Sequence, residues 1–131
     1  MNIGLDYGGV IDFDVSAWNS AVKACNKSGH KVFLISHAQE GEDAEKRALF
    51  CKNSDCTNLT FMDLKSGLQE VEIATRKSEL IRDHKIDLFI DDDLSRVVVA
   101  GIMSSTCACF YVPQSKWMIG LKLIESYGGV E

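Results

Sequence analysis

The feature that most constrains the fold is the alternation of short apolar runs with amphipathic segments along the whole chain. The apolar runs are predicted strands, at residues 1–5, 31–35, 58–62, 87–90 and 107–112. The segments with helical spacing are predicted helices, at residues 14–28, 43–52, 75–84, 94–103 and from 115 onward. This alternation is typical of a parallel sheet with helices on both faces. We therefore predict an α/β fold: a Rossmann-like three-layer domain with a five-stranded parallel sheet.

Size and charge narrow the possible partners. The chain has 131 residues, 46% of them hydrophobic, which suits one globular domain over 1–131. Its net charge of -5 comes without basic stripes, so neither nucleic acid nor an anionic membrane is an expected partner. No window approaches a membrane span, and no basic segment at the N-terminus leads into an apolar run.

The cysteines indicate a reducing compartment. There are five, an odd number, without paired CxxC spacing, which argues against a disulfide framework. We therefore expect a cytoplasmic protein. Cys107 and Cys109 lie two apart on a predicted strand and share one face, so we expect them to be buried. Their spacing relative to the histidines does not match a zinc site.

Polar side chains follow the predicted strands at the points where the strands end. Asp6 follows the first run, Ser36 the second, and the triplet Asp91-Asp92-Asp93 the fourth. In a parallel sheet these positions share one edge, where ligands bind. A carboxylate such as Asp6 can attack phosphorus if cations neutralise the approaching phosphate. Magnesium takes oxygen ligands, which Asp6 and the triplet could supply if their strands are neighbours.

Four segments in this order resemble the motifs of the haloacid dehalogenase (HAD) superfamily of phosphohydrolases. The first is Asp6-Tyr7-Gly8-Gly9-Val10, where the family usually has Asp-x-Asp-Gly-Val/Thr, and the second is Ser36 after Val32-Phe33-Leu34-Ile35. The third is Lys77 near the start of a predicted helix, and the fourth is the run from Asp87 to Asp93. The resemblance spans the chain from Asp6 to Asp93 and implies a magnesium-dependent phosphatase acting on a phosphorylated substrate.

The resemblance also implies roles for the metal site and the nucleophile. Asp6 would form an aspartyl-phosphate and would also bind Mg²⁺. Gly8 would offer its backbone carbonyl to the metal, and Asp91 and Asp92 would complete the site. Asp93 is a candidate cap for the following helix.

Further residues are candidates for holding the phosphoryl group. Ser36 and Lys77 would bind it according to the resemblance, and Lys77 could also pair with Asp6 as a point charge. Gly9 belongs to a glycine pair that could cradle phosphate. His37 could touch a ligand, or could be a turn-forming surface histidine.

Gly8 is the departure from the family pattern. Phosphatases of this family have a second aspartate there, which protonates the leaving oxygen and then activates water. Loss of a general acid–base costs about a hundred- to ten-thousand-fold in rate. Three consequences stay open: a substrate with a good leaving group such as an acyl phosphate, a substitute acid at Asp12 or Asp14, or binding without efficient turnover.

Two other functions are compatible with the sequence. One is a HAD-fold binding or regulatory module that has lost catalysis, for which Gly8 is the argument. The other is a receiver-like domain in which Asp63 accepts phosphate. The intervals between motifs leave no room for a large cap domain, and only 63–75 could form a small lid. An uncapped site suggests a large substrate or closure by an oligomeric partner.

Overall fold

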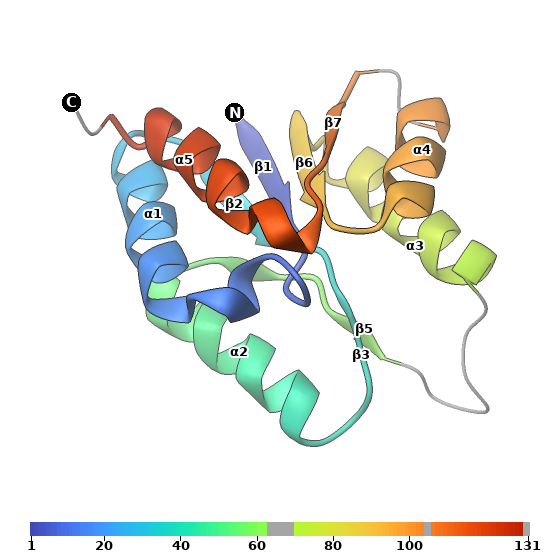
Figure 1. Cartoon of the computed structure of the whole chain (residues 1–131), viewed down its shortest axis with the longest axis horizontal. Helices are drawn as coiled ribbons and strands as arrows, with labels where there is room; N and C mark the ends of the chain where they lie inside the picture. The colour runs from blue at the N-terminus through green and yellow to red at the C-terminus, as the bar shows by residue number, and fades with distance from the viewer. Residues whose placement is uncertain (63–69, 104–105, 130–131) are drawn as a thin grey trace.

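A computed structural model describes residues 1–62, 70–103 and 106–129. Its main feature is a five-stranded parallel sheet with the strand order β4-β2-β1-β6-β7 (Figure 1). The strands are β1 (Asn2–Leu5), β2 (Lys31–Leu34), β4 (Thr57–Asn58), β6 (Leu88–Asp91) and β7 (Ala108–Tyr111). The predicted α/β class with a five-stranded parallel sheet is therefore confirmed.

Helices cover both faces of this sheet and form two separate hydrophobic cores. The helices are α1 (Val15–Lys27), α2 (Glu42–Ser54), α3 (Glu70–Asp83), α4 (Leu94–Met103) and α5 (Trp117–Tyr127), with short 3-10 turns η1 (Ile11–Phe13) and η2 (Gln114–Lys116). One core joins the sheet to α1, α2 and α5 through side chains such as Trp18, Phe50 and Ile124. The other joins it to α3 and α4 through Ile81, Phe89 and Ala100. Because alternate side chains of a strand point to opposite faces, the apolar runs of β1, β2 and β6 supply both cores.

The strand order places the ends of β1 and β6 side by side. Leu5 pairs with Ile90, and the backbone amide of Asp6 donates to the carbonyl of Ile90 at 3.1 Å. Connections leave this strand pair toward opposite sides of the sheet, which makes it the topological switch point where α/β proteins bind ligands. The prediction that the first and fourth runs are neighbours is thus confirmed.

The predicted strand 58–62 is wrong in its extent. Residues Thr57–Asn58 form β4 in the main sheet, whereas Phe61–Met62 form β5, which pairs with β3 (His37–Ala38) in a separate two-stranded sheet. The Asn58 side chain causes the break, because its Oδ1 accepts from both the amide (3.1 Å) and the hydroxyl (2.6 Å) of Thr60. Such Asx turns redirect the backbone away from the ladder.

Two helices also differ from prediction. The helix expected at 75–84 is already formed at Glu70, so Lys77 lies in its middle rather than near its start. The predicted helix 43–52 is α2, and helical spacing from Cys51 would place Ala44 and Ala48 inward; Ala48 is nevertheless exposed, while Arg47 is buried with Phe50 and Cys51.

The predicted burial of Cys107, just before β7, and of Cys109, on β7, is also wrong. Cys107 and Cys109 are only partly buried, because β7 is an edge strand.

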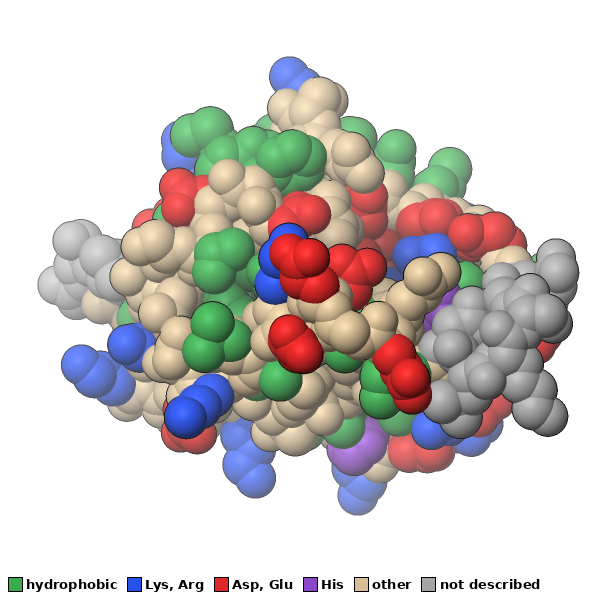
Figure 2. Space-filling model, turned by 90° about the horizontal axis from the view of Figure 1, so that it is seen from below, with side chains coloured by type: hydrophobic (Ala, Val, Ile, Leu, Met, Phe, Trp, Pro, Cys, Tyr) green, Lys and Arg blue, Asp and Glu red, His purple; other side chains and the backbone are tan. Residues whose placement is uncertain are grey.

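The surface at the end toward which the strands run carries side chains of both charges, interspersed with hydrophobic ones (Figure 2). No helix within the described parts of the chain has the length and apolarity needed to cross a membrane.

Candidate functional site

Lys77 is the centre of the site at the switch point. This α3 side chain is fully buried, and its Nζ lies 2.6 Å from Asp91 Oδ2 and 3.1 Å from Asp6 Oδ1. Burial alone would lower the pKa of Lys77, but the two carboxylates outweigh it and raise the pKa above its usual value. The ammonium therefore stays charged and ties α3 to the ends of β1 and β6.

Three carboxylates surround a common point beside this ammonium. One oxygen each from Asp6, Asp91 and Asp92 lies within 4.8 Å of the others. Burial, and next the charge of Asp6, raises the pKa of Asp91 to about 8 despite the bond to Lys77. Burial likewise raises the pKa of Asp92, against the hydrogen bond that its Oδ2 accepts from Gln114 at 2.8 Å. Arg96 is a second cation near the cluster, since burial lowers its pKa but Asp91 and Asp6 raise it above the usual value; its ion pairs are with Glu70 and Asp93.

This cluster fits the hard divalent cation that the sequence predicts. Its donors are oxygens from two neighbouring strand ends, as magnesium prefers. The raised pKa values of Asp91 and Asp92 reflect burial and repulsion that a cation would relieve. Asp93 turns away to cap α4, since its Oδ1 accepts from the amide (3.0 Å) and hydroxyl (2.6 Å) of Ser95. Asp6, Asp91 and Asp92 are therefore the side chains that would hold the metal.

The loop after β1 depends on Gly9. Gly9 has φ +75°, and a Cβ built on it would lie 2.1 Å from Asp92 Oδ2. A side chain here would be strained and would also displace the Asp92 carboxylate, a candidate metal ligand. Asp12 closes the same loop by accepting from the Gly9 amide at 2.9 Å, whereas Asp14 caps α1 by accepting from the Ala17 amide at 3.1 Å. Of the two candidate substitute acids, only Asp12 lines the pocket of the site.

Ser36 is covered by an arginine that the sequence analysis missed. Ser36 is fully buried, and its Oγ accepts from Arg47 Nε at 2.7 Å. Arg47 Nη1 donates to the carbonyl of Asp43 at 3.0 Å, and the guanidinium carbon lies 4.7 Å from the centre of the Tyr7 ring. These contacts fix the planar group in one orientation above the end of β2.

The missed arginine could have been found from helical periodicity. Arg47 lies three and four residues before Phe50 and Cys51, so it continues their inward face. An arginine on the buried face of the helix after Ser36 is a signal for a functional cation, since arginine is rarely buried without a partner. Arg96 and Gln114 are further pocket residues that the sequence analysis did not single out.

The open part of the site is a pocket of about 360 Å³. Its lining residues are Asp6, Gly8, Gly9, Asp12, His37, Arg47, Asp92, Asp93, Arg96 and Gln114. The structure thus brings the predicted Asp6, Gly8, Gly9, His37 and Asp92 to one cavity. Ser36, Lys77 and Asp91 lie behind its wall, fully buried. Asp63 lies outside the described residues. So do residues 63–69 of the predicted lid 63–75, whose remaining residues belong to α3.

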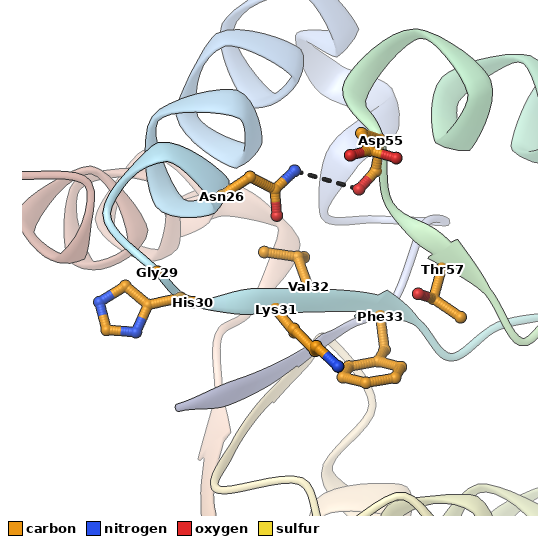
Figure 3. A pocket seen from close by; sticks show the side chains of 8 residues that line it. All are labelled: Asn26, Gly29, His30, Lys31, Val32, Phe33, Asp55 and Thr57. Carbon is orange, nitrogen blue, oxygen red and sulfur yellow. Dashed lines mark hydrogen bonds between the residues drawn. The ribbon is translucent and has the colours of Figure 1, made fainter.

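A second hollow, of about 450 Å³, lies at the beginning of β2, and none of Asp6, Asp91 and Asp92 lines it (Figure 3). There Asn26 donates to the carbonyls of Ser54 (2.9 Å) and Asp55 (3.0 Å) and so ties α1 to the end of α2. The hydrogen bonds of Asn26 thus serve the packing of the helices.

Comparisons with known proteins support the fold and leave the family open. No protein-family model matches the chain, and the search of curated proteins finds no relative. The structure is similar to a crystal structure of an uncharacterized protein from Corynebacterium glutamicum ATCC 13032 Kitasato, with a TM-score of 0.70 and 19% sequence identity. The match covers 99% of this chain and 96% of that one, so the likeness extends over the entire Rossmann-like domain.

Proposed function

We propose that this protein is a magnesium-dependent phosphohydrolase or phosphotransferase of the HAD type that uses Asp6 as its nucleophile. The observation that carries the proposal is the fully buried Lys77 between Asp6 and Asp91, with Asp92 beside them. A buried cation shared by two strand-end carboxylates costs free energy of folding, because the charged groups lose their hydration. Perturbed ionisable groups gathered beside a pocket are characteristic of active sites.

The residues divide the work as follows. Asp6 presents a carboxylate oxygen to phosphorus, and the ion pair with Lys77 at 3.1 Å holds that carboxylate in position. Ser36 lies at the end of β2 and would offer its hydroxyl to a phosphate oxygen, while Arg47 holds that side chain in place by donating to its Oγ. Mg²⁺, held by Asp6, Asp91 and Asp92, would neutralise phosphate charge as the bond forms. The five unpaired cysteines suit a reducing, cytoplasmic setting for this reaction.

The first test is phosphate release from a panel of phosphate esters and anhydrides with and without Mg²⁺. Asp6→Asn should abolish turnover, because an amide is a poor nucleophile. The matched control is Asp83→Asn, an exposed α3 carboxylate that should leave the rate unchanged. Acid-quenched protein should carry acyl-bound phosphate in the wild type and in the control, but not in Asp6→Asn. Turnover that survives Asp6→Asn would overturn the proposal.

A catalytically inactive binding module is the second candidate, and Gly8 favours it. Its signature would be Mg²⁺-dependent binding of a phosphate mimic such as trifluoroberyllate without turnover of any substrate in the panel. The receiver-like alternative finds no support in the strand order. Receivers follow the order 2-1-3-4-5, whereas here the third strand of the main sheet, β4, lies outside β2.

A further inference from the structure

We infer that Arg47 binds the leaving group, so that the site favours phosphoryl donors whose leaving group departs as a stable anion, namely acyl phosphates and phosphoanhydrides. This inference rests on the proposed function and names its substrate class. It starts from the space above Gly8, where the resemblance implies an acid and this chain has none.

Arg47 is the group that faces this space. A Cβ built on Gly8 would have Arg47 Nη2 at 3.7 Å as its contact. The other two guanidinium nitrogens donate to Ser36 Oγ and to the Asp43 carbonyl, and Tyr7 supports the plane from one side. Nη2 is therefore held toward the position above Gly8 at no further cost in side-chain entropy.

A guanidinium and a carboxylic acid do different work at this position. The guanidinium group of arginine does not act as a proton donor in general acid catalysis, but it stabilises developing negative charge. An alkoxide leaving group needs a proton, and its loss without an acid is slower by about a hundred- to ten-thousand-fold. A carboxylate or phosphate leaving group needs none. With an arginine instead of a carboxylic acid above position 8, the site therefore favours phosphoryl donors whose leaving group is a stable anion.

The surroundings of Arg47 have room for such a group. A third pocket, of about 440 Å³, is lined by Tyr7, Asp12, Val15, Asp43, Lys46 and Arg47. It shares Arg47 and Asp12 with the 360 Å³ pocket beside Asp6, so a leaving group that extends past Arg47 from that pocket enters this one. The charged side chains of this lining are two cations, Lys46 and Arg47, and two carboxylates, Asp12 and Asp43.

The reaction balances without an acid at position 8. An Asp6 oxygen forms a bond to phosphorus while the bond between phosphorus and the leaving oxygen breaks, and the electron pair stays on the departing anion. Water then attacks phosphorus and the bond to Asp6 breaks, which restores the carboxylate. One hydrogen of the water stays on the released phosphate, and the other passes to solvent as a proton.

The test compares acetyl phosphate with ethyl phosphate as substrates for matched variants. Arg47→Met should lower kcat/KM for acetyl phosphate by about a hundred- to a thousand-fold, the loss typical of one donor to a developing anion, and should affect ethyl phosphate far less. Arg82→Met, an exposed α3 arginine, is the control and should change neither value. Gly8→Asp, whose Cβ would meet Arg47 Nη2 at an ordinary contact distance, should raise ethyl phosphate hydrolysis by about a hundred-fold or more and should lower acetyl phosphate turnover by pairing with Nη2. It tests the inference even if Arg47→Met fails to fold.

The other outcomes separate the inference from the proposed function. An equal loss on both substrates in Arg47→Met would overturn the inference, because Arg47 would then bind the transferred phosphoryl group. Efficient ethyl phosphate hydrolysis that depends on Asp6 and is lost in Asp12→Asn would also overturn it, since Asp12 would be the acid, and the proposed function would stand. Absence of Asp6-dependent turnover on both substrates would overturn both.

Discussion

Replacement of Lys77 by methionine tests the electrostatic reasoning most directly. Methionine keeps the length and the apolar stem of lysine but removes the charge that Asp6 and Asp91 share at 3.1 and 2.6 Å. At an effective dielectric constant of about 20, the two contacts are worth about 5 and about 6 kcal/mol of Coulomb energy, most of which offsets desolvation. Removal of one partner of a buried ion pair costs about 3–5 kcal/mol, because the remaining charges stay buried. We expect a loss of this size at neutral pH.

The assay is urea unfolding followed by circular dichroism. With a slope of about 2 kcal/mol/M, the expected loss moves the midpoint down by about 1.5–2.5 M. Lys23→Met on the exposed side of α1 is the control and should shift it little. Mg²⁺ should restore part of the loss in Lys77→Met, because the cation replaces the missing charge. The defect should also shrink at acid pH, where the carboxylates protonate. A midpoint equal to that of the wild type at neutral pH would refute the reasoning.

Three further predictions concern the metal, the loop and the sheet. First, burial and Asp6 raise the pKa of Asp91 to about 8. The metal-free protein should therefore lose stability as pH rises toward and through that value, and the thermal shift caused by Mg²⁺ should grow over the same range, but not in Asp91→Asn. Second, Gly9→Ala should abolish Mg²⁺ binding measured by calorimetry. The control is Gly29→Ala, which is also at positive φ but has open space around it, and which should only lower the unfolding midpoint. Equal metal affinity in the two variants would contradict this prediction. Third, Asn58→Ala removes the acceptor of the turn between β4 and β5 and should cost about 1 kcal/mol in urea unfolding, with unchanged metal affinity.

Much of the site could be predicted because its residues carry local signals. Asp6 and Asp91 each end a run of apolar residues, and strand ends in a parallel sheet share one edge. Lys77 had no such local signal, since a lysine in a helix is usually solvated. Its role depends on α3 packing across the ends of two strands that are remote in sequence.

The sequence by itself determined the class of fold and the edge of the sheet at which polar groups gather. The reason is that the spacing of apolar residues along a short stretch of chain indicates both its secondary structure and its buried face. The tertiary structure decided which of those groups meet. The strand order placed Asp6 beside Asp91, and the packing of α2 brought Arg47 Nε to within 2.7 Å of Ser36 Oγ. These outcomes depend on the packing of whole strands and helices against one another. A short stretch of sequence does not specify which other strand or helix will become its neighbour.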